Sequence, residues 1–135
     1  MKTAVDSSVL FDIVKGAPGA AAAQASLEEA LSGGGLCVCA VVVAELGRYF
    51  ASAEDLRDFL ADCQIDHDPV SFEAALQAAR IMRAYAANKG PRERVAPDFL
   101  IGAHALTQAD GLITADAGFF RRYFAGLRVI APYNA

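Results

Sequence analysis

Residues 96–132 read APDFLIGAHALTQADGLITADAGFFRRYFAGLRVIAP, and this stretch decides the fold class. A proline at the first helical position predicts a helix over residues 97–109. Apolar residues then predict a strand at 111–114, a helix at 119–124 and a strand at 128–131. Short apolar strands that alternate with helices are typical of a parallel sheet covered by helices on both faces. The stretch therefore predicts an α/β protein.

The rest of the chain repeats this alternation. Three further strands and five further helices are expected. The strands are at residues 2–5, 36–40 and 64–66, and the helices at 8–15, 18–31, through 45 to about 51, 54–62 and 71–88. Ser8 and Ser71 are expected to cap their helices, and the last of these helices shows an apolar stripe that begins with Phe72 and Leu76. We expect a three-layer α/β/α architecture with a central, mostly parallel sheet.

Length and composition limit the class of protein. The 135 residues suit one domain, 1–135, and 55% are hydrophobic, which excludes a disordered chain. No apolar run reaches the roughly 18 residues of a membrane span, and the first residues do not resemble a secretory signal. Three cysteines cannot close a disulfide framework and indicate a reducing compartment, so we expect a cytoplasmic protein without a membrane partner.

Charge is distributed unevenly along the chain. The net charge is −4, but residues 1–75 hold 4 Lys and Arg against 12 Asp and Glu, whereas residues 76–135 hold 8 against 4. This asymmetry has two interpretations. One is a basic surface for an anionic partner beside an acidic site, and the other is an ordinary mixed solvated surface.

Four acidic residues are candidates for a site at the carboxyl edge of the predicted sheet. Asp6 comes directly after the first strand, and Glu45 lies in the apolar helix segment VVVAEL after the second. Asp98 is near the start of the helix at 97–109, and Asp116 comes two residues after the strand segment LIT. Each could instead serve locally, as a helix cap or a turn residue, although a glutamate among apolar neighbours is rarely left unpaired. The carboxyl ends of parallel strands are where such sheets place their functional sites.

A site built from several carboxylates has a defined chemistry. Like charges repel one another and raise one another's pKa, and a divalent cation relieves this repulsion. Hard oxygen ligands without Cys or His favour Mg²⁺, with Mn²⁺ as a substitute. Such an ion can activate water against a phosphodiester.

Four blocks carry a resemblance to a known family. They are VDSSVLFDI, VVVAEL, APDFLIGAHAL and LITADAGFFRRYFAGLRVIAP. Together they resemble a PIN domain, in particular the small VapC-type toxin ribonucleases of bacterial toxin–antitoxin pairs, and the resemblance covers the whole chain. It implies a metal-dependent endoribonuclease that cleaves RNA, such as transfer or ribosomal RNA. It also implies a co-encoded antitoxin as inhibitor and a homodimer.

The resemblance also assigns roles to residues. The residues that match the family's acidic metal site are Asp6, Glu45, Asp98 and Asp116. Two small hydroxyl positions, Ser8 and Thr114, match those that support the site. The chain departs from the pattern before the second acid, where the family often has Ser or Thr and this sequence has Cys39 and Val42.

Basic residues near the acids are candidates for RNA binding. Lys89, Arg92 and Arg94 precede Asp98 in a Gly- and Pro-containing loop, and Arg121 and Arg122 follow Asp116. They are expected to hold phosphates around an otherwise repulsive acidic site. The alternative is a solvated loop and helix surface.

Other residues that could bind metal are interpreted as structural. His67 lies between Asp66 and Asp68 and is predicted in a polar loop, whereas His104 is expected to be a partly buried helix residue. Cys37 and Cys39 alternate on one strand face as core thiols, and C-x-C with one distant cysteine is poor zinc spacing.

Two other functions each need a residue that the sequence lacks. A receiver-type signalling domain would need a Lys at the end of a late strand, and the last strand segment, LRVIAPYNA, has none. An aspartyl phosphatase would need D-x-D after the first strand, where this sequence has Asp6-Ser7-Ser8. A PIN-like binding module without catalysis stays open as the alternative. A docking surface for a second copy or an antitoxin is expected around Phe50, Leu56 and Phe59.

Overall fold

The computed structural model describes residues 1–88 and 94–133 of the chain. The strands within these residues are β1 (Thr3–Val5), β2 (Leu36–Val38), β3 (Ile65–His67), β4 (Leu112–Ile113) and β5 (Val129–Ile130). The α-helices are α1 (Ser7–Lys15), α2 (Ala20–Gly33), α3 (Ala40–Leu46), α4 (Ala53–Asp62), α5 (Phe72–Ala87), α6 (Ala96–Gln108) and α7 (Ala117–Tyr123). The 3₁₀ turn Gly47–Tyr49 follows α3, so the helix predicted to continue to about residue 51 ends earlier.

The described strands form one parallel sheet in the order β3-β2-β1-β4-β5. Ala4 of the central strand β1 pairs with Cys37 of β2 on one side and with Leu112 of β4 on the other. The chain moves outward from β1 to β3, returns, and then builds β4 and β5 on the opposite side of β1. The strand order therefore switches between β1 and β4, which is where a sheet of this kind opens a crevice at its carboxyl edge.

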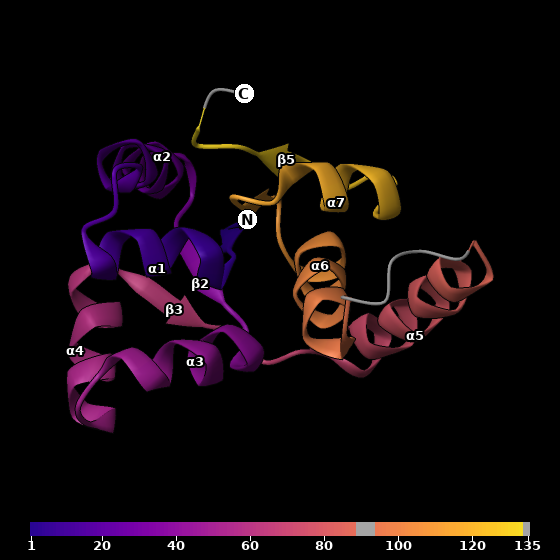
Figure 1. The fold of residues 1–135 in the computed structure, drawn as a ribbon, viewed down its shortest axis with the longest axis horizontal. Coiled ribbons are helices and arrows are strands. Elements are labelled where there is room, and N and C mark those ends of the chain that lie inside the picture. The colour runs from indigo at the N-terminus through magenta and orange to yellow at the C-terminus, as the bar shows by residue number, and fades with distance from the viewer. Residues whose placement is uncertain (89–93, 134–135) are drawn as a thin grey trace.

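Helices cover both faces of the sheet, which confirms the predicted three-layer α/β/α architecture. The helix α1 packs against α2 and α3, whereas α6 packs against α5 and contacts β1 and β4. Figure 1 shows α5 and α6 side by side, well separated from the pair α1 and α2. No helix in residues 1–88 and 94–133 is long and apolar enough to cross a membrane.

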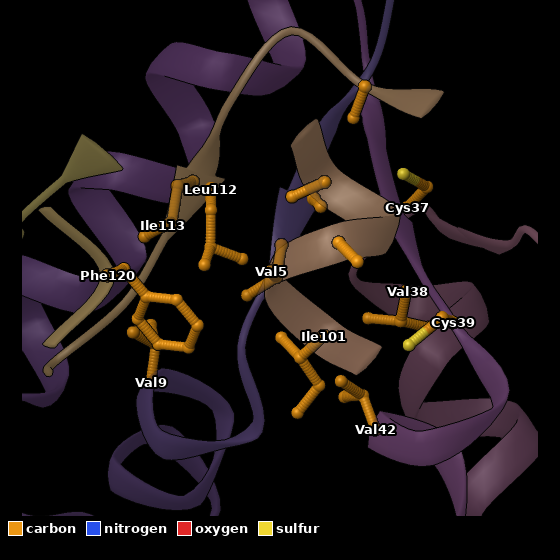
Figure 2. Close-up of a cluster of buried hydrophobic side chains, with 14 of the residues drawn as sticks. Val5, Val9, Cys37, Val38, Cys39, Val42, Ile101, Leu112, Ile113 and Phe120 are labelled. Atoms are coloured by element: carbon orange, nitrogen blue, oxygen red, sulfur yellow. The ribbon is translucent and has the colours of Figure 1, made fainter. Parts of the chain in front are cut away.

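One buried cluster joins the layers. Figure 2 shows strand side chains meeting side chains of α1, α3, α6 and α7, and each of the labelled residues is at most 3% exposed. They are Val5, Val9, Cys37, Val38, Cys39, Val42, Ile101, Leu112, Ile113 and Phe120. All residues of β1, β2 and β4, the strands at the centre of the sheet, are buried, as a sheet covered on both sides requires.

The buried face of α5 differs from the predicted stripe. Phe72 and Leu76 are 73% and 54% exposed, whereas Ala74, Ala78 and Ile81 are buried. The predicted stripe was wrong because it followed apolar residues that lie beside the polar side of the helix. The buried residues lie opposite the polar stripe formed by Glu73, Gln77, Arg80 and Arg83. Close packing of α5 against α6 favours the face with small alanines.

The start of α1 also differs from prediction. Asp6, not Ser8, is at the N-cap position, and its side chain makes no capping hydrogen bond. At the other end Gly16 adopts a left-handed φ of 62° and closes the helix as expected. The carboxylate of Asp6 is thus available for contacts across the sheet.

Candidate active site

The four acidic residues lie around the carboxyl edge of the sheet near the β1–β4 switch. Asp6 directly follows β1, and Asp116 is three residues beyond the end of β4, at the start of α7. Glu45 is on α3, which follows β2, and Asp98 is in the first turn of α6. The parallel sheet brings these separate segments to one edge because all of its strands end there.

Asp6 is the most buried of these acids, with 7% of its surface exposed. Its Oδ2 accepts a hydrogen bond from Thr114 Oγ1 at 2.7 Å and one from Ser8 Oγ at 3.0 Å. Burial raises the pKa of Asp6, and the charge of Asp98 raises it further, while the two hydroxyl bonds act in the opposite direction. The carboxylate is therefore anchored by hydroxyls but held in surroundings that disfavour its charge.

The two hydroxyls also fix the segment after β4. Ser8 Oγ accepts from the backbone N–H of Ala115 at 3.2 Å, and Thr114 Oγ1 accepts from that of Asp116 at 2.9 Å. Each hydroxyl thus donates to Asp6 and accepts from the loop that carries Asp116. This geometry fits the supporting role that the resemblance implies for Ser8 and Thr114.

Glu45 is held by a residue that the sequence analysis did not select. Ser7 Oγ donates to Glu45 Oε1 at 2.7 Å, and Ser7 is 5% exposed. Cys39 is at the N-cap of α3 without a side-chain capping bond, as the departure from the family pattern suggests. The hydroxyl support of Glu45 therefore comes from α1 instead, and its signal in the sequence is only the first serine of the Asp-Ser-Ser segment.

Arg94 completes the arrangement as a cation among the acids. Its Nη1 lies 2.5 Å from Asp116 Oδ2 and 3.8 Å from Asp98 Oδ2, and its guanidinium carbon lies 4.1 Å from the ring centre of Phe119. Burial lowers the pKa of Arg94, but the hydrogen bond and charge of Asp116 and the charge of Asp98 outweigh it, so the net shift is upward. Arg94 is thus engaged with carboxylates in this structure.

The other candidate RNA-binding residues divide into two groups. Arg121 and Arg122 are exposed on α7, and the Arg122 guanidinium lies 5.4 Å from the ring centre of Tyr123. Lys89 and Arg92 lie outside the described residues. Arg121 and Arg122 therefore lie on the helix that begins directly after Asp116.

The donor set fits a hard divalent ion. The acids offer only carboxylate oxygens as ligands. In the described residues their negative charge is partly offset by the guanidinium of Arg94, which contacts Asp98 and Asp116. The acids do not form a group of three whose ligand atoms lie within 4.8 Å of one another in the described part of the chain. Mg²⁺ suits such spacing, because it is commonly bound through one or two carboxylates and keeps several waters.

The other residues set aside in the sequence analysis lie elsewhere. Asp66 belongs to β3, as the predicted strand at 64–66 implies, but β3 also includes His67, so the polar loop predicted for His67 is wrong and only Asp68 follows the strand. Asp68 pairs with the buried ring of His104, whose Nε2 lies 2.9 Å from Asp68 Oδ2. These groups lie on a different part of the sheet from the four acids.

Comparison with protein families and solved structures finds one consistent relationship. A family model described as the PIN domain matches residues 3–125. VapBC2 from Rickettsia felis, solved with a DNA fragment from its promoter, has a similar structure with a TM-score of 0.77 and 16% identity, over 99% of this chain and 100% of that chain. VapBC-1 from nontypeable Haemophilus influenzae has a TM-score of 0.75 and 18% identity over 98% of each chain.

A third similar structure is a toxin–antitoxin complex from Klebsiella pneumoniae. Its TM-score is 0.65 and its identity 19%, over 99% of this chain and 100% of that chain. No curated protein matches the chain. At these identities the solved structures establish a shared fold.

Proposed function

Because the chain belongs to the PIN domain family, we propose that it is a metal-dependent endoribonuclease and the toxin of a toxin–antitoxin pair. We take residues 1–135 as a single PIN-like domain that acts in the cytoplasm. The observation that carries the proposal is the connected set of carboxylates at the carboxyl edge of the sheet. Ser7 ties Glu45 to α1, Thr114 ties Asp6 to the segment directly after β4, and Asp116 is paired with Arg94.

Each acid has a proposed part in holding Mg²⁺, for which Mn²⁺ could substitute. Asp6, Glu45, Asp98 and Asp116 would bind the ion directly or through its waters. The ion when bound would lower the pKa of a water and stabilise the leaving oxygen of a phosphodiester. Ser7, Ser8 and Thr114 hold the carboxylates in place, so that little rearrangement is needed when substrate arrives.

The raised pKa of Asp6 supports the metal proposal. Burial and the negative charge of Asp98 both penalise the ionised form of Asp6. A divalent cation would remove this penalty, whereas the single guanidinium of Arg94 contacts Asp98 and Asp116 but not Asp6 in the described structure. The site is therefore electrostatically incomplete with protein groups alone.

The RNA would be held by cations around the acids. Arg121 and Arg122 are exposed on α7 and available to phosphates, and Lys89 and Arg92 are proposed to act with them. Arg94 would exchange its carboxylate partners for a phosphate when a metal ion neutralises Asp98 and Asp116. The RNA is proposed to be transfer or ribosomal RNA, as the resemblance to the toxin family implies.

An antitoxin is the proposed protein partner, and it is supported by the toxin–antitoxin complexes that share the fold. The expected docking surface has an apolar groove of about 480 Å³ between α3 and α4, lined in part by Val43, Leu56 and Leu60. The rings of Phe50 and Phe59 pack beside each other with centres 5.2 Å apart. We propose that the antitoxin binds in this groove. Separately, we propose that the protein forms a homodimer.

A nuclease assay tests the function. Purified protein should cleave RNA with Mg²⁺ or Mn²⁺ and stop when EDTA is added. Asp98→Asn should lower the single-turnover rate by roughly 10²-fold, the scale for removing one group that stabilises developing charge. RNA binding should persist or tighten, because repulsion toward phosphate falls. Asp110→Asn is the matched control, because Asp110 is half exposed and its carboxylate pairs with the N-terminal amine, 3.6 Å away.

One observation favours the alternative of a binding module without catalysis. Arg94 already neutralises part of the charge of Asp98 and Asp116, as a metal ion would. If the parent protein binds RNA but cleaves none in Mn²⁺, and Asp98→Asn changes neither result, the binding module replaces the nuclease. Full cleavage in excess EDTA would reject the metal mechanism.

A further inference from the structure

A second cluster of potential metal ligands lies apart from the four acids. Cys37 of β2, Asp68 after β3 and His104 of α6 place one ligand atom each within 4.8 Å of the others. In the described part of the chain this is the group of three that meets this spacing. The residues are separated by 31 and 36 positions in sequence, so the sheet and α6 bring them together.

The three side chains are held before any ion arrives. Cys37 and His104 are 2% and 1% exposed, and each is on a regular element whose backbone is fixed by hydrogen bonds. His104 Nε2 lies 2.9 Å from Asp68 Oδ2. The Asp68 side chain is 39% exposed, so the cluster is closed on the protein side and open at the carboxylate.

A neighbouring glutamine positions Asp68. Gln108 Nε2 donates to Asp68 Oδ2 at 3.2 Å and to the carbonyl of Pro69 at 2.8 Å, while its Oε1 accepts from the N–H of Ser71 at 2.8 Å. Gln108 is one turn after His104 on α6. It therefore fixes the loop that carries Asp68 relative to the helix that carries His104, as residues behind metal ligands commonly do.

An open pocket leads to the cluster. A surface pocket of about 330 Å³ is lined by residues that include Cys37, Asp68 and Gln108. Lys2 also lines it, but its ammonium is paired with Asp66 Oδ2 at 2.8 Å. A cation can thus approach from solvent and meet the carboxylate first.

We propose that Cys37, Asp68 and His104 form a binding site for one Zn²⁺ ion. A sulfur, a ring nitrogen and a carboxylate oxygen are the ligands that Zn²⁺ takes, and three protein ligands with an open fourth position are typical of an accessible zinc site. In a tetrahedral complex, nitrogen and oxygen ligands lie about 3.3 Å apart, given bond lengths of about 2.0–2.1 Å. The His104–Asp68 pair therefore needs to widen by only a few tenths of an ångström.

This site differs chemically from the proposed nuclease site. The four acids offer hard oxygens, which favour Mg²⁺, whereas a thiolate and an imidazole favour a softer ion. The inference therefore does not depend on the proposed function. The other explanation of the same geometry is a buried His104–Asp68 hydrogen bond beside a core thiol, without any ion.

Cobalt substitution distinguishes these explanations in the full chain. Chelator-treated protein is titrated with Co²⁺ in excess Mg²⁺, which occupies carboxylate sites. One equivalent should produce a thiolate-to-cobalt charge-transfer band in the near ultraviolet and intense visible bands of tetrahedral cobalt. Zn²⁺ should displace the cobalt and raise the melting temperature. Cys37→Ser should abolish the charge-transfer band, whereas Cys39→Ser, which alters the other buried thiol of the same segment, should retain it.

A second variant keeps the test informative if Cys37→Ser folds poorly. Asp68→Asn changes a partly exposed side chain and should weaken Zn²⁺ binding by more than about tenfold, with the circular dichroism spectrum unchanged. Absence of the charge-transfer band in the parent overturns the proposal. So does a band of equal intensity in Cys37→Ser, or Zn²⁺ affinity that is the same in Asp68→Asn and the parent.

Discussion

Thr114→Val removes one hydroxyl that joins two parts of the acidic site. Thr114 is 0% exposed, and its Oγ1 donates to Asp6 at 2.7 Å and accepts from the N–H of Asp116 at 2.9 Å. Valine has a similar shape but cannot replace either bond, so the change tests hydrogen bonding more than packing.

The expected loss follows from these two contacts. A hydrogen bond to a charged group contributes about 1.5–3 kcal/mol, and an N–H left without its partner adds up to about 1 kcal/mol where water reaches it. The unfolding free energy should therefore fall by about 1.5–4 kcal/mol at neutral pH. Thr107→Val on the exposed face of α6 should change it by less than about 0.5 kcal/mol.

The loss should depend on pH. The Thr114 hydroxyl lowers the folded-state pKa of Asp6, so its removal raises that pKa further above the unfolded value. A carboxyl group whose pKa is higher in the folded state than in the unfolded state adds to the unfolding free energy below its unfolded-state pKa. This contribution is lost as the pH rises through the folded-state pKa. The variant thus loses more than the parent as Asp6 ionises, and the difference between them should shrink in acid.

Urea unfolding followed by circular dichroism measures both effects. The transition midpoint should shift at neutral pH with an unchanged slope, and the shift should diminish on acidification. A loss no larger than that of Thr107→Val would refute the reasoning. So would a loss of the same size at neutral and acidic pH, because the bond to ionised Asp6 would then not be its cause.

Three further variants test other parts of the molecule. Arg92→Ala combined with Arg94→Ala should weaken RNA binding and reduce its salt dependence. The Mg²⁺ affinity measured by calorimetry should not fall, because Arg94 competes with the ion for the same carboxylates. Weaker metal binding in the double variant would contradict this. Gly102→Ala should lower stability by about 1–3 kcal/mol in thermal unfolding, because a Cβ there would meet the Phe124 ring, and an unchanged melting temperature would be inconsistent with that contact. Phe59→Asp should keep the fold but weaken antitoxin binding in pull-down titrations, and unaltered binding would move the docking surface elsewhere.

Local sequence was sufficient for the class of fold. Alternating strand and helix segments predicted a parallel sheet in three layers, and the observed order β3-β2-β1-β4-β5 is all parallel. Asp6, Glu45 and Asp116 could be located at the carboxyl edge because each follows a strand in the sequence, whereas Asp98 lies at the start of the helix that precedes β4. Both inferences depend only on the order of short segments and their hydrophobic pattern.

Helix faces were less predictable. The stripe beginning at Phe72 and Leu76 is exposed, and the opposite face with Ala74 and Ala78 is buried. The polar residues Glu73, Gln77 and Arg80 lie opposite the buried face, so the polar positions indicated it better than the apolar ones. Apolar residues alone did not select the face that packs against α6, because they occur on both sides of the helix.

The sequence by itself determined which elements form, in what order, and that several carboxylates reach one edge of the sheet. Only the tertiary structure decided which side chains meet: Ser7 with Glu45, 38 residues apart, and Asp68 with His104, 36 residues apart. It also placed Cys37 beside that pair, although its spacing in the chain argued against a metal site. Hydrogen bonds and metal sites depend on distances of a few ångströms between atoms, and the sheet order and helix packing set those distances for residues far apart in sequence.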